Sequence, residues 1–135
     1  MEMEKKANVL LVDDELDFLR PIVAWLKSIG YTVSLALNGK DAVQLVKGSN
    51  QYSILFLDMD MPDMSGLEVL EKIREFNREM PILLMVQNSK DEKRFVRARD
   101  FGISGFFEKS ATFDEFVKML EKTLQVHKQY RPYSA

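Results

Sequence analysis

The stretch from residue 54 to residue 68 reads ILFLDMDMPDMSGLE, and it indicates how the chain folds. Its first four residues form an uninterrupted hydrophobic run, which is typical of a strand that is buried on both faces of a sheet. The run ends at Asp58, and a helical pattern begins at Gly66 after a short loop that contains Pro62. A buried strand that leads through a loop into a helix is the repeating unit of a parallel sheet.

The same unit recurs along the whole chain. We predict strands at residues 8–12, 32–36, 54–57, 82–86 and 105–107 and helices at residues 17–29, 40–47, 66–76, 91–101 and 112–127. Parallel neighbours need crossover connections, which helices supply. The alternation therefore predicts a doubly wound α/β fold, in which five helices cover a five-stranded parallel sheet.

Local signals support several helix starts. The patterns Ser65-x-x-Glu68 and Thr112-x-x-Glu115 predict capping boxes, in which a hydroxyl and a carboxylate satisfy free backbone N–H groups. Pro21 is expected near the first turn of its helix, where a missing N–H is tolerated.

Composition narrows the class of protein. A chain of 135 residues with 46% hydrophobic content suits one compact domain, which we place at residues 1–127, with residues 128–135 as a frayed C-terminal tail. The net charge of -2 disfavours direct nucleic-acid binding, which needs a basic excess. The absence of cysteine fits a reducing cytoplasm, and no apolar run is long enough to span a membrane.

Charged residues follow three of the predicted strands. Asp13 and Asp14 follow the first strand, Asp58 follows the third, and Glu108 and Lys109 follow the fifth. Ligands of open parallel sheets bind beyond the carboxyl ends of the strands, so these side chains are expected to converge on one crevice. An acidic pair such as Asp13-Asp14 alone would indicate only a turn or a helix cap, and the combination carries the prediction.

Carboxylates packed this closely repel each other unless a cation neutralises them. Oxygen ligands without histidine favour Mg²⁺, and Mn²⁺ could replace it. A carboxylate beside such an ion and a lysine can attack phosphorus, because the cations offset the charge of the phosphoryl oxygens. The expected product is an aspartyl phosphate.

The segments at residues 9–15, 54–68 and 105–109 resemble the receiver domains of bacterial response regulators, and the resemblance spans about residues 8–125. It implies a flavodoxin-like sheet with the strand order 2-1-3-4-5. It also implies that the protein is a two-component signalling module rather than an enzyme, apart from its own phosphorylation and dephosphorylation.

The resemblance assigns roles to individual residues. Asp58 is implied to be the phosphoacceptor and Lys109 to contact the phosphoryl group. Asp14 and Asp58 are implied to bind Mg²⁺ directly, Asp13 through water, and Asp60 through its backbone carbonyl.

The implied partners are a sensor histidine kinase or phosphotransfer protein and a downstream protein effector; the oligomeric state stays open. The docking face is expected on the last two helices and the last strand. Four aromatic residues are candidates for contacts there, namely Phe95, Phe106, Phe113 and Phe116.

The sequence departs from the receiver pattern at two positions. Receivers usually have Thr or Ser at the end of the fourth strand, where this chain has Gln87 followed by Asn88. They generally have Lys-Pro with a cis bond where this chain has Lys109-Ser110, so a trans bond is expected. Phe106 occupies the position of an aromatic switch residue, although core packing explains it equally well.

Two alternatives remain open at this stage. Gln87 and Ser110 would also suit a pseudo-receiver, a binding module that phosphorylation does not control. The Asp58-Met-Asp60 sequence is similar to the paired aspartates of haloacid-dehalogenase-type phosphatases. In that family, however, the pair follows the first strand, and here it follows the third.

Overall fold

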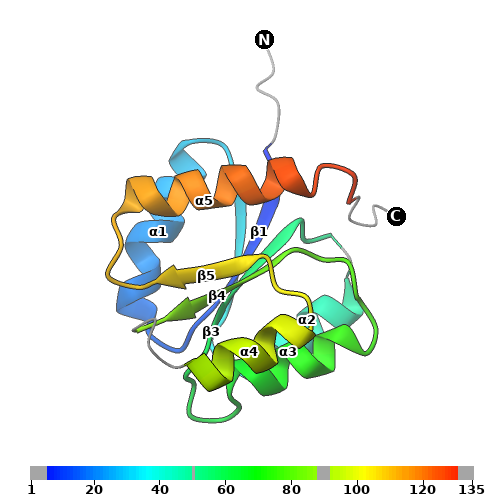
Figure 1. The fold of residues 1–135 in the computed structure, drawn as a ribbon. Helices are drawn as coiled ribbons and strands as arrows, with labels where there is room; N and C mark the ends of the chain where they lie inside the picture. Colours follow the sequence, from blue (N-terminus) through cyan, green and yellow to red (C-terminus); the bar gives the residue numbers. More distant parts are fainter. Residues whose placement is uncertain (1–5, 50, 88–91, 131–135) are drawn as a thin grey trace.

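The computed structural model describes residues 6–49, 51–87 and 92–130. Strands and helices alternate along these residues (Figure 1). The strands are β1 (Asn8–Val12), β2 (Thr32–Ala36), β3 (Ile54–Asp58), β4 (Ile82–Val86) and β5 (Gly105–Glu108). The helices are α1 (Leu16–Ser28), α2 (Gly39–Gly48), α3 (Gly66–Arg74), α4 (Glu92–Asp100) and α5 (Phe113–Val126).

The strands form one sheet in the order β2-β1-β3-β4-β5, and every pair of neighbours is parallel. This confirms the predicted doubly wound, flavodoxin-like topology. Helices α1 and α5 cover one face of the sheet, and α2, α3 and α4 cover the other (Figure 1). Asp58 lies opposite Met85 in the register, so the third and fourth strands end at the same edge.

Two of the three inner strands, β3 and β4, are buried on both faces along their whole length. Every residue of β3 and of β4 is buried, because each strand has helices above and below it. The outer strand β2 is only partly buried. Complete burial explains why these central strands are continuous hydrophobic runs rather than alternating patterns.

The predicted capping boxes are confirmed in part at the atomic level. The Ser65 hydroxyl accepts a hydrogen bond of 3.2 Å from the Glu68 backbone N–H, and the Thr112 hydroxyl accepts one of 3.2 Å from Glu115. A cap that was not predicted begins α2, where the Asn38 side chain accepts a bond of 2.8 Å from the Asp41 N–H.

Pro21 lies slightly deeper in its helix than the first turn, near which it was expected. It lies inside α1, which begins at Leu16, and not in the first turn. The helix continues to Ser28. One missing N–H donor at the Pro21 position is therefore tolerated within a helix that buries Leu19 and Leu26 against the sheet.

Strands β1, β2 and β4 match the prediction to the residue, and the bounds of the other elements differ by one or two residues. Asp58 and Glu108 belong to their strands, whereas α3 ends at Arg74 instead of residue 76. The predicted start of α4 at residue 91 lies outside the described residues.

The C-terminal tail was expected to be frayed, and Tyr130 departs from this expectation. Tyr130 packs against the core, and its hydroxyl accepts a hydrogen bond of 3.3 Å from the Asn77 side chain. The rest of the tail, residues 131–135, lies outside the described residues.

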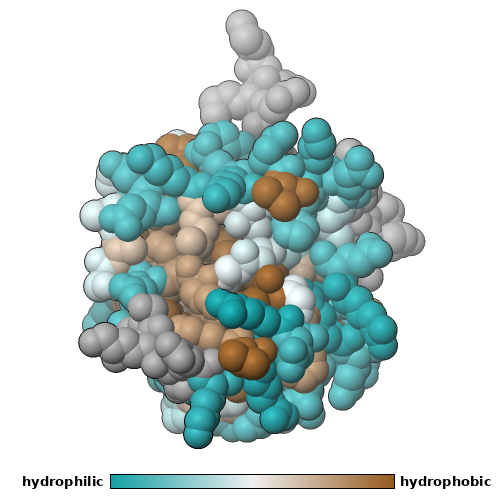
Figure 2. Space-filling view, in the orientation of Figure 1, coloured by the Kyte–Doolittle hydropathy of each residue, from teal (hydrophilic) through white to brown (hydrophobic). Residues whose placement is uncertain are grey.

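One face of the molecule is formed by α4, β5 and α5. Figure 2 shows this face, with polar side chains along the two helices and apolar side chains gathered between them. None of the helices in the described ranges combines the length and apolar composition that crossing a membrane requires.

Gly66 allows α3 to begin directly against the third strand. A Cβ atom at this position would lie 2.5 Å from the Asp58 carbonyl oxygen and 2.7 Å from the Met59 Cα. We therefore expect Gly66→Ala to lower the free energy of unfolding by about 1–3 kcal/mol, because backbone must shift to relieve the overlap.

Gly48 provides the matched control, since a Cβ there would meet nothing within 4 Å. Gly48→Ala should leave the free energy of unfolding unchanged or raise it by up to about 1 kcal/mol, because alanine favours helix. Urea denaturation of both variants measures the difference. Equal stability of the two variants would contradict the close approach at Gly66.

Candidate functional site

Three carboxylates meet at the carboxyl edge of the sheet, as the sequence predicted. Asp13 follows β1 and Asp58 ends β3, and both side chains are buried, whereas Asp14 is exposed. One carboxylate oxygen from each of the three residues lies within 4.8 Å of the others. Neighbouring parallel strands end side by side, which brings together residues that are far apart in the sequence.

Lys109 completes the cluster from the end of β5. Its Nζ atom lies 2.7 Å from Asp13 Oδ2, 3.4 Å from Asp58 Oδ2 and 3.3 Å from Glu15 Oε1. Its side chain is only 6% exposed, and Nζ lies 5.0 Å from the centroid of the Phe18 ring. The ammonium group is thus the counter-charge of both buried carboxylates.

Hydrogen bonding satisfies one oxygen of each buried carboxylate. Asp13 Oδ1 accepts a bond of 2.9 Å from the Glu15 backbone N–H, and Asp58 Oδ1 accepts one of 3.2 Å from the Asp60 N–H. The other oxygens, Asp13 Oδ2 and Asp58 Oδ2, are buried without a hydrogen bond, and Lys109 is their ion-pair partner. Buried, incompletely satisfied carboxylate oxygens are what a hard divalent cation would bind.

The burial of like charges changes the acidity of the cluster. Burial raises the pKa of Asp58 to about 7, and the neighbouring charge of Asp13 adds to this; the Asp60 N–H and Lys109 offset part of the shift. Burial alone would lower the pKa of Lys109, but its close contact with the Asp13 carboxylate and the charges of Asp58 and Asp13 raise it overall. Lys109 is therefore charged at neutral pH.

The remaining predicted residues lie around this cluster. The Asp60 carboxylate is not part of it, and instead pairs with Arg94 of α4 at 2.8 Å. Gln87 follows β4 and is exposed, and its side chain makes no hydrogen bond with the described residues; Asn88 lies outside them. Phe106 is half-buried, with its ring centroid 4.1 Å from that of Phe95.

The described residues contain no cis peptide bond. The bond between Lys109 and Ser110 is therefore trans, as predicted. The segment after Lys109 therefore enters α5 without the cis bond that the receiver pattern usually has. Lys109 nevertheless reaches both buried carboxylates.

Sequence reasoning missed three contacts of the site. Glu15 binds Lys109, Arg94 binds the loop after Asp58, and the Asp63 carboxylate accepts hydrogen bonds of 3.2 Å from the Gly39 N–H at the start of α2. Glu15 could have been found, because it extends the acidic pair before it. Arg94 and Asp63 join distant segments, and no sequence spacing indicates such contacts.

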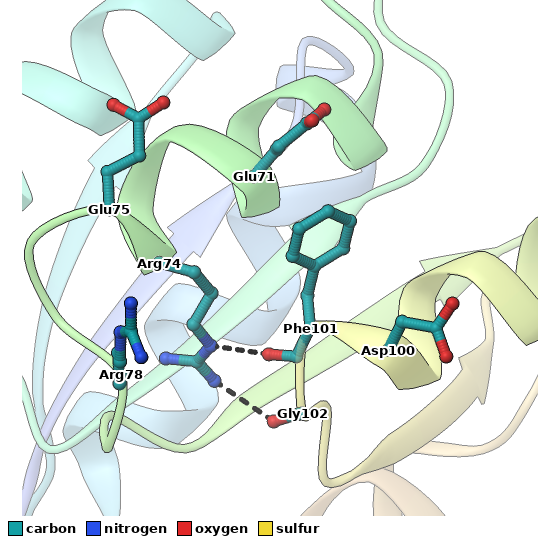
Figure 3. Close-up of a pocket in the computed structure, with 7 residues that line it drawn as sticks. All are labelled: Glu71, Arg74, Glu75, Arg78, Asp100, Phe101 and Gly102. Atoms are coloured by element: carbon teal, nitrogen blue, oxygen red, sulfur yellow. Dashed lines mark hydrogen bonds between the residues drawn. The ribbon is translucent and has the colours of Figure 1, made fainter.

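A cavity of about 540 Å³ lies away from the acidic cluster, near the C-terminal ends of α3 and α4 (Figure 3). Arg74 forms part of the cavity wall. Its guanidinium donates hydrogen bonds to the backbone carbonyls of Phe101 and Gly102 at 2.8 and 3.1 Å. Further bonds join it to the carbonyls of Asn77 and Met80. Arg74 therefore ties the end of α3 to the turn after α4, which is a structural role.

Comparison with known proteins agrees with this geometry. The family model of the response regulator receiver domain matches residues 9–121. The chain is 33% identical over 119 residues to the transcriptional regulatory protein ZraR of Salmonella typhimurium, which covers 88% of this chain and 26% of ZraR. The chain thus spans about a quarter of that relative's length.

Solved structures show the same fold. The response regulator protein TrrA of Thermotoga maritima, solved in complex with Mg(2+)-BeF, is 30% identical with a TM-score of 0.77, and the match covers 88% of this chain and 100% of TrrA. The chemotaxis protein CheY4 of Vibrio cholerae is 26% identical with a TM-score of 0.77, and the match covers 87% of this chain and 98% of CheY4.

The fold and the acidic cluster define a receiver-type α/β domain. The chain belongs to the response regulator receiver domain family, whose members are the phosphoacceptor modules of two-component signalling.

The raised pKa of Asp58 predicts how metal-free stability depends on pH. In the folded protein the pKa of Asp58 is about 7, whereas in the unfolded chain it has the ordinary value of 3.8. Between these values the folded state binds more protons, so the free energy of unfolding should fall as pH rises, by about 2 kcal/mol from about pH 5 to 8.

Asp58→Asn should remove this contribution, because an amide does not titrate. Urea denaturation of both proteins in a chelator, at both pH values, measures the effect. The same loss of stability in the two proteins would show that Asp58 does not carry it.

Proposed function

We propose that Asp58 accepts a phosphoryl group from a sensor histidine kinase or phosphotransfer protein. The observation that carries the proposal is the pair of buried, incompletely satisfied carboxylates of Asp13 and Asp58, held beside Lys109 at the sheet edge. Solvent-excluded charges of this kind are unfavourable for stability alone, and they suit a site that binds cations and phosphoryl oxygens.

The residues at this edge fit Mg²⁺. Asp14 and Asp58 would bind it directly, Asp13 through water, and Asp60 through its backbone carbonyl. Mn²⁺ has similar ligand preferences and would serve as a substitute. The bound ion would offset the negative charge of the phosphoryl oxygens.

The chain's own groups account for the transfer step. An Asp58 carboxylate oxygen forms a bond to phosphorus, and the bond between phosphorus and the donor breaks, so that the electron pair leaves with the donor. The Lys109 ammonium, 3.4 Å from Asp58 Oδ2, is positioned to bind a phosphoryl oxygen as charge builds there. Because Lys109 also binds Asp13, its position is fixed before the donor arrives.

We further propose that the protein signals through a downstream protein effector in the cytoplasm, and that it has no enzymatic activity beyond its own phosphorylation and dephosphorylation. The expected docking face is the one formed by α4, β5 and α5. Of the four aromatic candidates, Phe95 and Phe116 are buried, and Phe113 packs on Trp25 of α1. Only the half-buried Phe106 remains, together with the exposed Val96.

No observation favours the two alternatives. The pseudo-receiver hypothesis was based on Gln87 and Ser110, but neither residue takes part in the contacts between Lys109 and the acidic cluster. The phosphatase rested on Asp60 as a second catalytic acid, and its carboxylate is bound to Arg94.

Phosphorylation can be tested without the kinase. Incubation with acetyl phosphate and Mg²⁺ should increase the intact mass by one phosphoryl group, and Asp58→Asn should abolish the gain. Asp100→Asn, at the exposed far end of α4, is the matched control and should keep the gain. A protein that never gains the mass would reject the proposed role of Asp58.

Mg²⁺ should also stabilise the folded protein, because the ion binds the native cluster and not the unfolded chain. At about 100 times its dissociation constant the gain should be roughly 2.7 kcal/mol. Thermal unfolding in Mg²⁺ and in a chelator measures it, and Asp13→Asn should weaken it. Equal melting temperatures in Mg²⁺ and in chelator would rule out the site.

A further inference from the structure

Asp60 is two residues from the proposed acceptor, yet its carboxylate points elsewhere. The oxygens of Asp13, Asp14 and Asp58 form a group within 4.8 Å, and Asp60 is not part of it. The Asp60 side chain is 57% exposed, and its Oδ1 atom lies 2.8 Å from Arg94 Nη2. A fourth carboxylate is therefore turned away from the cluster and toward α4.

Arg94 holds this arrangement through two bonds from one nitrogen. Besides Asp60 Oδ1, Nη2 donates to the Met59 carbonyl at 3.0 Å. The same carbonyl accepts a bond of 2.9 Å from the Gly66 N–H, which fixes the loop at the start of α3. Because one amino group binds the backbone of Met59 and the side chain of Asp60, it sets the direction of the Asp60 carboxylate.

The backbone of Asp60 shows how near this residue is to the reacting group. Its N–H donates to Asp58 Oδ1 at 3.2 Å. We therefore expect that the carboxylate of the same residue, once released from Arg94, can turn toward a water beside the acceptor. Carboxylates that reach a bound water near a reacting centre act as general bases.

The reaction that such a base would assist is hydrolysis of the aspartyl phosphate. The oxygen of a water molecule forms a bond to phosphorus, and the bond between phosphorus and the Asp58 oxygen breaks. Asp58 leaves as a carboxylate, the proton of the water passes to the Asp60 carboxylate, and inorganic phosphate is released.

We propose that Arg94 is a positioning residue that keeps Asp60 out of the acceptor site and thereby lengthens the lifetime of the phosphorylated state. The inference rests on the proposed function of Asp58 and deepens it. Since Arg94 belongs to α4, a displacement of that helix would release Asp60 and hasten dephosphorylation.

The first experiment compares the lifetimes of phosphorylated variants. Each protein is labelled with acetyl phosphate and Mg²⁺, the donor is removed, and the loss of one phosphoryl group is followed by intact mass. Arg94→Gln should shorten the half-life about tenfold, less than the roughly 100-fold effect of a fully positioned base. Arg94→Met, which keeps apolar packing, should do the same if the glutamine variant folds poorly.

Arg97 on the same helix offers the matched control. Its guanidinium lies 3.8 Å from Glu71, both side chains are largely exposed, and the pair does not touch the acceptor loop. Arg97→Gln removes the same charge from α4 and should leave the half-life unchanged. A similar shortening in both variants would attribute the effect to the charge of the helix and overturn the inference.

A double-mutant cycle isolates the role of Asp60. Asp60→Asn cannot accept the proton, so adding Arg94→Gln to it should have no further effect on the half-life. A shortening that persists in the Asp60→Asn background would overturn the inference, as would a half-life of Arg94→Gln within about twofold of the unmodified protein, given the size expected for a general base.

A second measurement does not depend on phosphoryl transfer. A released Asp60 carboxylate adds negative charge beside the cluster, so Arg94→Gln should bind Mg²⁺ about threefold more tightly in calorimetric titration, and not in the Asp60→Asn background. If no form gains a phosphoryl group, the proposed function fails and this titration alone decides where Asp60 points. Unchanged Mg²⁺ affinity, or no binding at all, would overturn the inference.

Discussion

The contact between Lys109 and the carboxylates of Asp13 and Asp58 is the interaction on which the site depends. Two buried carboxylates that share one ammonium leave a net negative charge in a solvent-excluded place. Burial and the charge of Asp13 raise the pKa of Asp58 to about 7, so protonation of Asp58 removes part of this negative charge. The chain can fold with such a cluster, but its carboxylates lack a full counter-charge. They therefore favour binding of a divalent cation and, with it, phosphoryl oxygens.

The sheet topology explains why a lysine provides the counter-charge. Asp13 follows β1 and Asp58 ends the neighbouring strand β3, so their side chains lie close together. Lys109 follows β5, which is separated from β3 by β4. A long side chain is needed to cross the end of β4, and its ammonium Nζ lies over the Phe18 ring, 5.0 Å from the ring centroid. The order of the strands thus selects the length of the residue as well as its charge.

How accurately a feature could be predicted from the sequence depended on the physical origin of that feature. Strands 32–36 and 82–86 were predicted to the residue, because hydrophobic runs record burial directly. The acidic cluster was predictable because a general rule places strand ends together. Pro21 lies deeper in its helix than expected, because a helix held by tertiary packing tolerates a proline. The contact of Tyr130 with Asn77 was missed, because a contact of the tail leaves no periodic pattern in the sequence. The Asp60–Arg94 pair joins a loop to a distant helix, and only coordinates reveal it.

The loop after Asp58 is held from both sides, and this bears on how a phosphoryl group would be sensed. Asp63 binds the start of α2, and Arg94 binds Met59 and Asp60 from α4. The residue that follows β4 is the exposed Gln87, which has no hydroxyl. Phosphorylation would add negative charge next to a loop to which Arg94 is already hydrogen-bonded. Its electrostatic effect would therefore reach α4 through the guanidinium, without any movement of Gln87.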